Sequence, residues 1–493
     1  MKQLLLIICA LTISLQASST VLNIPGTFPT ISAALTAATA YDTILVAPGI
    51  YNENITWPAK AGIKLMSSGG SAVTTINGGG TGRVLNFTSS IIDTTTHIVG
   101  FIITGGYIGT GSGYGAGLYL SNASVTMEDL VIRNNRVYVP GGHAYGAGIH
   151  LSNSISVMRN CTVMSNSIDS ATWCYGGGIY ISGGAPELIG VVIMNNSARA
   201  EKWCYGVGLY ARNGATLKLT NIEISQNVSG NDAIWYYGNG MYMDDVNATL
   251  TNVLVVNNQS GSGGSFNYGG GIYCDGTSVV QMMHVTIANN TKTGGAAITG
   301  SGLYSRDAAV QVTNSIAYNP NSGSEIAFGG TGAIVVDFSN VRNGYAGNSN
   351  INLTPGFVSA SDYHLTPASP CTGAGTLAGS PYFDLDGNTR PLPSWTNPDM
   401  GCYEVDQSAT GIQDNWNELT NKLKVYPNPA KRNSLIYIEN VLNKHIIITD
   451  MKGGLVFEEQ STIPIFNFYT ESLQPGMYLI HTGEKSPAKL IIH

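Results

Sequence analysis

The stretch GGGIYISGGAPELIGVVIMNN, residues 176–196, decides the fold because close copies of it recur along the chain. The next copy is GVGLYARNGATLKLTNIEISQN, residues 206–227. The opening motif Gly-x-Gly-(Leu/Ile/Met)-(Tyr/His) begins at Gly115, Gly146, Gly176, Gly206, Gly238, Gly269 and Gly300. Successive copies are 31, 30, 30, 32, 31 and 31 residues apart. A period this constant indicates a stack of repeated structural units.

Each repeat contains two segments with β-strand patterning. In the first segment an aliphatic residue alternates with an aromatic one, which predicts that the aliphatic side chain points inward and the aromatic side chain outward. The outward residues are Tyr119, His150, Tyr180, Tyr210, Tyr242, Tyr273 and Tyr304. The second segment carries predicted core residues at Val163, Ile193, Ile224, Val255 and Ile287. Units this short cannot bury an apolar face alone, so we expect an all-β, right-handed parallel β-helix.

The second segment of each repeat ends in asparagine, at Asn135, Asn166, Asn196, Asn227, Asn258 and Asn290. Asparagine side chains that turn inward at a bend can bond to the same residue one coil away, which predicts a buried ladder. The Gly-x-Gly motif marks a corner, since glycine admits positive φ. It is not a phosphate-binding loop, because no helix follows it.

The first residues and the composition limit the classes of function. Lys2, the apolar run Leu4–Leu15 and the small residues that follow predict a signal peptide over residues 1–19. Charged residues make up 11% of the chain, the net charge is −7 and there is no basic stripe, so we expect no nucleic-acid partner. None of the cysteines lies in a CxxC pair, so we expect no metal site of that kind.

The chain before the repeats resembles the pectin-lyase-like and pectinesterase-like β-helices. FPTISAALTAA, residues 28–38, resembles their N-terminal capping helix, and DTILVAPGIYNENI, residues 42–55, resembles their first coil. HIVGFIITGG, residues 97–106, is similar to a recurrent β-helix turn, and the resemblance covers roughly residues 24–318. Gly49, Tyr51 and Glu53 match the GxYxE element of pectinesterases, but the catalytic Asp and Arg motifs are missing. The resemblance therefore implies the architecture, over residues 20–345, without pectin ester hydrolysis.

A different module follows at residues 346–405. DYHLTPASPCTGAGT, FDLDGNTRP and PDMGCYE resemble a closing module called choice-of-anchor Q, found after β-helices in secreted bacterial proteins. We expect Cys371 and Cys402 to close this module with a disulfide. Asp384 and Asp386 fit either a turn or a calcium site, and no other cofactor is expected.

The last part of the chain has its own character. A polar linker is expected over residues 406–422, and the alternating runs after it predict a small antiparallel β-sandwich at residues 423–493. VYPNP, ITDMKGG, LQPGMYLI and KLIIH in this region resemble the type A sorting domain of type IX secretion substrates. The resemblance implies recognition of residues 423–493 by the secretion machinery, cleavage, and release or coupling to surface lipopolysaccharide. We therefore expect a bacterial protein that is secreted or held at the outer-membrane surface.

The strongest functional feature is aromatic. Besides the tyrosine column, a second column of aromatic residues ends the long turn of each repeat, at Trp173, Trp203, Trp235 and Phe266. Together the two columns can form a trough for an extended glycan, because aromatic faces pack against the C–H faces of sugars. The alternative is that the rings only stack on one another and stabilise neighbouring coils.

Candidate catalytic residues are sparse. Asp244 and Asp275 share a register on neighbouring coils, where paired carboxylates can act as general acid and base or bind calcium for a lyase. Turn residues explain the same pair. Cys174 and Cys204 also share a register, as a disulfide or as two packed thiols. Three functions remain open: an adhesin or polysaccharide-binding protein, a polysaccharide lyase or glycoside hydrolase, and a purely structural surface protein.

Overall fold

The computed structural model describes residues 19–263, 266–293, 298–320, 323–406, 423–439, 441, 443–451, 454–463, 465–482 and 488–493. The chain divides into two compact units, residues 1–405 and 406–493. Residues 1–18 of the predicted signal peptide and 407–422 of the predicted linker lie outside the described residues. In the described part of the chain, no helix is long and apolar enough to cross a membrane.

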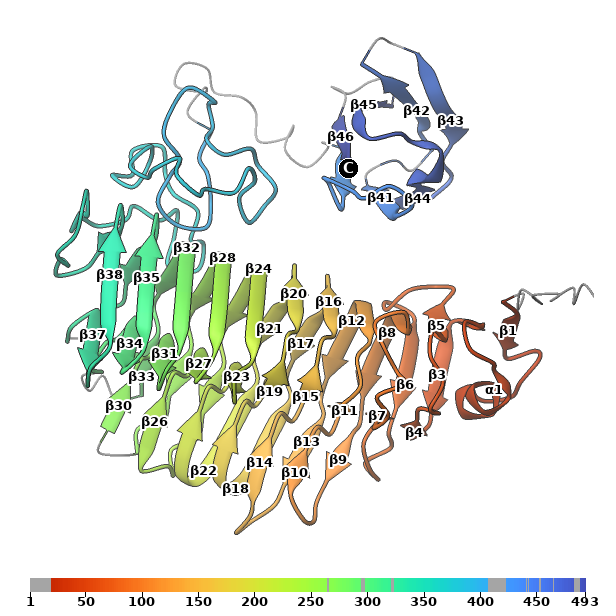
Figure 1. Ribbon diagram of the computed structural model, residues 1–493, viewed down its shortest axis with the longest axis horizontal. Helices are drawn as coiled ribbons and strands as arrows, with labels where there is room; N and C mark the ends of the chain where they lie inside the picture. The colour runs from red at the N-terminus through yellow and green to blue at the C-terminus, as the bar shows by residue number, and fades with distance from the viewer. Residues whose placement is uncertain are drawn as a thin grey trace, which may run out of the picture. The chain divides into compact units, whose positions relative to one another are not determined.

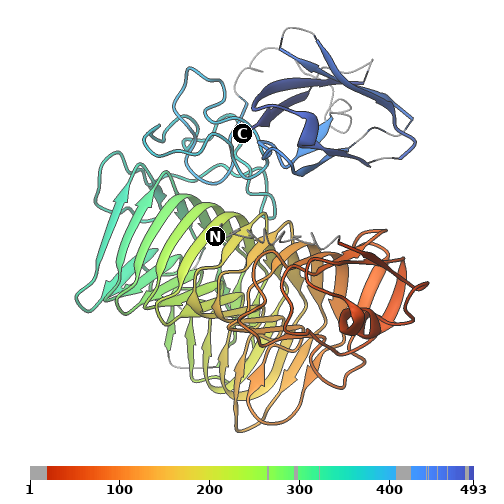
Figure 2. The ribbon, with the colours of Figure 1, turned by 45° about the vertical axis from the view of Figure 1, so that its right-hand side comes forward.

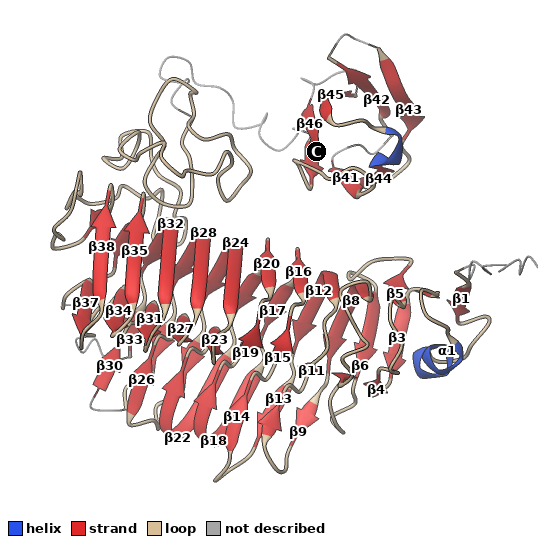
Figure 3. Cartoon of the chain, in the orientation of Figure 1, coloured by secondary structure: helices blue, strands red, loops and turns tan. Residues whose placement is uncertain are grey.

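The first unit contains a parallel β-helix, in which three sheets run along one axis (Figures 1 and 3). Sheet A contains β1 (Val21–Ile24), β2 (Thr43–Val46), β3 (Gly49–Asn52), β5 (Lys64–Ser67), β6 (Thr74–Asn77), β8 (His97–Thr104), β12 (Thr126–Arg133), β16 (Val157–Arg159), β17 (Thr162–Met164), β20 (Glu187–Ile189), β21 (Val192–Met194), β24 (Thr216–Ser225), β28 (Asn247–Val256), β32 (Val279–Ala288), β35 (Ala309–Thr313), β36 (Ile316–Tyr318), β38 (Ala333–Asp337) and β39 (Asn340–Val341). Sheet B contains β4 (Ile55–Thr56), β7 (Leu85–Phe87), β11 (Leu118–Ser121), β15 (Ile149–Ser154), β19 (Ile179–Gly184), β23 (Leu209–Arg212), β27 (Met241–Asp244), β31 (Ile272–Asp275), β34 (Leu303–Arg306) and β37 (Ile326–Gly329). Sheet C contains β9 (Tyr107–Ile108), β10 (Gly113–Tyr114), β13 (Arg136–Tyr138), β14 (His143–Tyr145), β18 (Ser167–Tyr175), β22 (Ser197–Tyr205), β25 (Val228–Ser229), β26 (Trp235–Tyr237), β29 (Gln259–Ser260), β30 (Phe266–Tyr268) and β33 (Thr291–Lys292).

Each repeat contributes strands to sheets C, B and A in turn, and the coils are in register. β22 of sheet C leads into β23 of sheet B and then into β24 of sheet A, and the next coil repeats this order. Figure 2 shows the successive coils of the first unit side by side. Leu209 pairs with Met241, and Ile224 pairs with Val255, so the same position recurs in neighbouring coils. The sequence predicted two strands in each repeat, whereas the structure has a third, because the long turn is itself β structure.

The aliphatic positions of sheets A and B fill the main core, as predicted. Ile193, Ile224 and Val255 are fully buried, and Cys161 and Cys274 lie among them. Sheet C encloses a second, smaller core that contains Val137, Ile168, Ala200, Cys204 and Tyr236, together with other small residues. The segments of sheet C therefore form an arm, defined as the residues between each ladder asparagine and the next Gly-x-Gly motif.

The predicted asparagine ladder is confirmed. Asn196 donates from Nδ2 to Oδ1 of Asn227 at 3.0 Å, and Asn227 does the same to Asn258 at 2.9 Å. Each ladder asparagine is fully buried and also bonds to backbone groups of the adjacent coil. The ladder ends at Glu325, which accepts hydrogen bonds from the backbone N–H and from Nδ2 of Asn319. Burial raises the pKa of Glu325 to about 7.

The predicted N-terminal helix is present as α1 (Ile31–Ala37). Thr30 caps it by accepting a hydrogen bond from the Ala33 N–H at 3.1 Å. Glu53 accepts hydrogen bonds from the N–H groups of Ile31 and Ser32, each at 2.8 Å. The glutamate of the pectinesterase-like element is therefore engaged in capping a helix.

Residues 346–405 form loops that pack against sheet A. The ion pair between Arg390 and Glu404, 2.9 Å from Nε to Oε2, has no exposed side-chain surface. Arg390 also donates to Oδ1 of Asn252 in β28 at 2.7 Å. Asp384 accepts hydrogen bonds from the backbone N–H groups of Asp386 at 3.0 Å and of Asn388 at 2.7 Å, which is the bonding of a turn residue. Across the described residues, no group of three His, Cys, Asp or Glu side chains is placed to hold a metal ion.

The predicted disulfide between Cys371 and Cys402 is wrong. The six cysteines of the described residues are free and buried. Met400, and not Cys402, lies opposite Cys371, because the Met400 N–H donates to the Cys371 carbonyl at 2.9 Å. The two thiols belong to different apolar clusters, and the Cys371 Sγ accepts a hydrogen bond from Nδ2 of Asn340. Cys174 and Cys204 are register partners inside the arm and are free thiols.

The second unit consists of two antiparallel sheets around its own core, as predicted. One sheet contains β40 (Lys424–Tyr426), β41 (Leu435–Glu439) and β44 (Ile465–Tyr469). The other contains β42 (His445–Asp450), β43 (Leu455–Gln460), β45 (Gly476–His481) and β46 (Ala488–Ile492). Alternate residues such as Ile436, Ile438, Ile446 and Ile480 are fully buried between the two sheets.

Candidate glycan-binding surface

Three parallel rows of stacked rings run along the β-helix where sheet B meets the arm. The inner ladder, on sheet B, consists of Tyr119, His150, Tyr180, Tyr210, Tyr242, Tyr273 and Tyr304. The middle ladder, on the arm, consists of Tyr114, Tyr145, Tyr175, Tyr205, Tyr237 and Tyr268. The outer ladder, also on the arm, consists of His143, Trp173, Trp203, Trp235 and Phe266. In-register parallel strands place equivalent rings one strand spacing apart, so each ladder follows from the repeat.

The inner ladder lies outside the main core, as predicted, but most of its rings are covered and stack on one another. Its rings stack with centroids 4.8–5.5 Å apart, and Tyr210, Tyr242 and Tyr273 are only 2–4% exposed. The cause is the middle ladder, which meets the inner rings edge to face. Tyr205 lies 5.1 Å from Tyr242 with an interplanar angle of 77°. Alternation in sheet B correctly places these tyrosines outside the main core, but the arm covers them.

The middle ladder could have been found in the sequence. Each of its tyrosines immediately precedes the first glycine of a Gly-x-Gly motif and stands five residues before the inner-ladder residue of the same coil, as Tyr175 does before Tyr180. A second aromatic column at a constant offset from the first indicates two facing rows. Edge-to-face ring pairs contribute about 0.5–1.5 kcal/mol each beyond their buried area, so the interlocked rows stabilise the arm against sheet B.

The outer ladder contains the exposed ring of this surface, Phe266. Trp173 and Trp203 are half-buried and stack at 4.8 Å with an interplanar angle of 13°, so they present mainly their edges. Toward the C-terminal coils the stack opens. Trp235 is tilted by 40° from Trp203, and Phe266, which is 44% exposed, is tilted by 59° from Trp235. Ring faces are therefore turned out of the stack at Trp235 and Phe266.

A strip of charged residues borders the inner ladder on sheet B. Asp244 and Asp275 are register partners, as predicted, and Arg212 and Arg306 flank them in the adjacent coils. Arg306 binds Asp275 with both arms of its guanidinium, at 2.7 Å to Oδ1 and 2.6 Å to Oδ2, and the Tyr242 hydroxyl donates to Oδ2 as well. Both carboxylate oxygens of Asp275 are thus engaged, and its side chain is 5% exposed.

Asp244 is more open than Asp275. It is half-buried and accepts a hydrogen bond from the Tyr210 hydroxyl at 3.4 Å. Burial raises the pKa of Asp244, and the neighbouring charge of Asp275 raises it further, while Arg212 opposes the shift. Because Asp275 is sequestered by Arg306, the geometry gives no support to these two residues as a free acid–base pair.

His150 stands in the inner ladder in place of tyrosine and gives the ladder a pH dependence. Burial lowers its pKa to about 3, and Arg83 lowers it further, so His150 is neutral in the folded protein. As the pH falls below about 6.5, His150 becomes protonated in the unfolded chain but stays neutral in the folded chain, so the folded protein loses stability. Between pH 6.5 and 4.5, we expect the wild-type protein to lose about 2–3 kcal/mol more of its free energy of unfolding than the His150→Phe variant loses. Denaturant unfolding of both proteins at the two pH values measures this difference. Equal losses of stability in the two proteins would contradict the prediction.

Comparison with known proteins accounts for both units. The model of a right-handed β-helix region matches residues 116–304, and the model of a secretion system C-terminal sorting domain matches residues 424–493. This is a secreted, type IX-sorted β-helix protein. The sorting domain implies handling by the type IX secretion machinery and a cell-surface or extracellular location in bacteria.

Two further comparisons concern the whole chain of this secreted β-helix protein. No curated protein matches its sequence. Among solved structures, it is similar to pectate lyase Pel9A, with a TM-score of 0.42 and 13% identity, over 78% of this chain and 97% of that one.

Proposed function

We propose that this protein is a cell-surface adhesin that binds an extended polysaccharide along the outer ladder. The observations that support the proposal are the loss of parallel stacking at Trp235 and Phe266, on successive coils, and the exposure of the Phe266 ring. Aromatic faces pack against the apolar C–H faces of pyranose rings, and a row of such faces suits a chain of sugars. Phe266 is 44% exposed, although a large aromatic residue is ordinarily buried.

The two tyrosine ladders have a supporting role in this proposal. Burial raises the pKa of Tyr205, Tyr210 and Tyr273, so these hydroxyls stay protonated and uncharged. Ring faces that already touch one another are not available to a sugar. We therefore restrict the sugar-contacting residues to Trp173, Trp203, Trp235 and Phe266, and assign to Tyr119, His150, Tyr180, Tyr210, Tyr242, Tyr273 and Tyr304 the positioning of the arm.

Two consequences of the sorting domain belong to the same proposal. Cleavage of residues 423–493 after export, and coupling of the β-helix to surface lipopolysaccharide, would hold the outer ladder at the cell surface, where a polysaccharide ligand is within reach. The β-helix unit has a core separate from that of the second unit, which suits a domain that is removed.

The proposal is tested with the mature chain, from residue 20, on columns that carry plant, algal or bacterial polysaccharides. We expect retention on at least one polysaccharide and a loss of affinity of about tenfold or more for Trp235→Ala, equivalent to about 1.4 kcal/mol. Trp395→Ala is the matched control, because Trp395 is 81% exposed and lies outside the three ladders. Absence of retention, or an equal effect of the two substitutions, would refute the proposal. Release of new reducing or unsaturated ends would instead indicate a polysaccharide lyase or hydrolase.

A further inference from the structure

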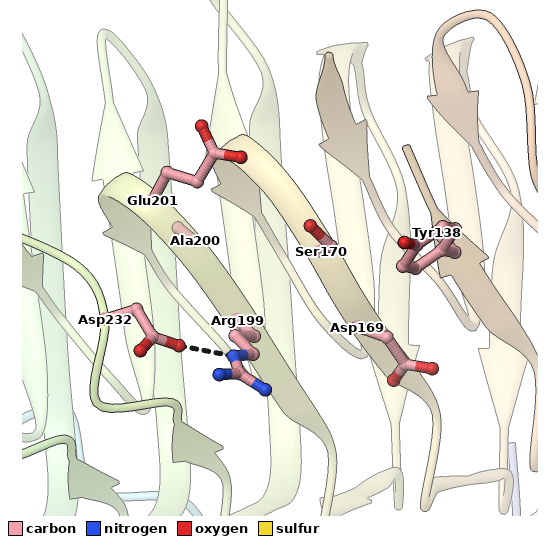
Figure 4. Close-up of a pocket in the computed structure, with 7 residues that line it drawn as sticks. All are labelled: Tyr138, Asp169, Ser170, Arg199, Ala200, Glu201 and Asp232. Carbon is pink, nitrogen blue, oxygen red and sulfur yellow. Dashed lines mark hydrogen bonds and ion pairs between the residues drawn. The ribbon is translucent and has the colours of Figure 1, made fainter. Parts of the chain in front are cut away.

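A shallow hollow lies on the part of the arm that follows the ladder asparagines. The outer ladder lies on the part of the arm that comes just before the Gly-x-Gly motifs. The hollow has a volume of about 360 Å³. It is lined by Tyr138, Asp169, Ser170, Arg199, Ala200, Glu201 and Asp232 (Figure 4). The lining comes from β13, β18 and β22, with Asp232 from the next coil. Small-molecule sites begin at about 300 Å³, so the hollow suits a ligand about the size of one sugar residue.

Asp169, Arg199 and Asp232 of the hollow are held by ion pairs. Arg199 binds Asp232 through Nε, and Figure 4 shows Arg199 between Asp232 and Asp169. Arg136 binds Asp169 through Nε in the same diagonal arrangement one coil earlier. Each pair leaves further guanidinium N–H donors and a second carboxylate oxygen directed elsewhere. Donors and acceptors therefore alternate along this surface.

One wall of the hollow is aromatic. Tyr138 is 39% exposed, and the Arg136 guanidinium carbon lies 5.6 Å from its ring centroid. The guanidinium limits the movement of this ring, and Tyr138 pairs with Ser170 in the neighbouring strand. A tyrosine ring beside a serine hydroxyl offers an apolar surface and a polar group side by side.

This combination matches the chemistry of a pyranose. Adjacent hydroxyl groups of a sugar each donate and accept, so a pair of them can bridge the arginine N–H and the carboxylate oxygen of one ion pair. Arg136 neutralises Asp169 and Arg199 neutralises Asp232, so Glu201 leaves the hollow with an excess of one negative charge. That charge disfavours uronic acids and sulfated sugars.

We propose that this hollow is a second carbohydrate site, which binds a single neutral pyranose residue. Tyr138 supplies the stacking surface, and Arg199, Asp232 and Asp169 bind the hydroxyl groups. The site uses none of the residues of the outer ladder, and it can bind the end or a branch of a glycan independently of that ladder.

The experiment measures binding of methyl glycosides of neutral hexoses to the mature chain by ligand-observed NMR, with the methyl glycoside of a hexuronate alongside. We expect at least one neutral hexose to bind with a Kd of about 1 mM, and the hexuronate to bind at least tenfold more weakly. Asp232→Asn keeps the shape of the side chain and should lower the affinity at least fivefold, and Arg199→Met should do the same. Ser197→Ala, on the same strand but outside the lining, is the control.

The outcomes distinguish failure of the hollow from failure of the outer ladder as a polysaccharide site. Binding that survives both Asp232→Asn and Arg199→Met, or absence of binding by every neutral hexose at about 10 mM, overturns the hollow as a site. If retention on polysaccharide still depends on Trp235 in that case, the outer ladder remains supported as a site and only the hollow is refuted. If hexose binding depends on Asp232 while Trp235→Ala has no effect on retention, the hollow is supported as a site and the outer ladder is refuted.

Discussion

Replacing Asn227 with alanine should lower the free energy of unfolding of the β-helix by about 3–5 kcal/mol. Asn227 Nδ2 donates to the Ile193 carbonyl and to Oδ1 of Asn258, each at 2.9 Å. Its Oδ1 accepts from the backbone N–H and from Nδ2 of Asn196, each at 3.0 Å. All of these groups are buried, and alanine leaves several of them without a partner, each costing about 1–3 kcal/mol before relaxation.

The measurement is the midpoint of denaturant unfolding, followed by the fluorescence of the aromatic ladders. Asn247→Ala is the matched control, since Asn247 is an exposed asparagine on the next sheet A strand, β28. The control should change stability by no more than about 0.5 kcal/mol. If the two substitutions have equal effects, the asparagine ladder contributes nothing specific to the stack.

Replacing Arg390 with methionine should cost a similar amount, about 3–5 kcal/mol, because it leaves Glu404 as an uncompensated buried carboxylate. Glu404 accepts hydrogen bonds from Arg390 Nε and from the backbone N–H groups of Leu392 and Asp399. Burial raises the pKa of Glu404, and Arg390 opposes that rise. In the variant the pKa is raised further, so protonation relieves the buried charge at low pH, and the loss of stability grows as the pH rises.

Unfolding of the Arg390→Met protein at pH 5 and pH 8 tests both the size and the sign of this effect. The double variant Arg390→Met, Glu404→Gln should recover part of the loss, because the buried charge is removed. Lys218→Met is the control, since Lys218 pairs with Glu187 on the surface and its side chain is 64% exposed. An Arg390→Met protein that is most destabilised at pH 5 would contradict the expected sign.

The repeat made most of the fold predictable. Glycine corners, aliphatic columns and the asparagine ladder follow from a period that places like residues on like positions, and these elements are where they were expected. The exposure of Tyr210 and its equivalents was not predictable from alternation, because alternation shows on which side of a strand a residue lies and not what covers that side. The arm covers that side, and the sequence pattern of the long turn does not mark it as β structure.

The two sites differ in how visible they are in the sequence. The tryptophans of the outer ladder recur with the period and were predicted as one group. Asp169, Arg199 and Asp232 do not repeat as one residue type, and they meet only because neighbouring coils are offset by one strand spacing. The disulfide prediction failed for a related reason, since proximity of Cys371 and Cys402 in one module did not determine which residue faces which.

The stacking of coils has a mechanical consequence. The backbone hydrogen bonds between coils run along the axis in all three sheets, so a pull along that axis loads the bonds of sheets A, B and C together. A coil separates from its neighbour only when its strands in every sheet give way. A pull on one sheet alone would instead peel its bonds one after another. Stacked coils of this kind therefore resist axial tension far better than sideways prying.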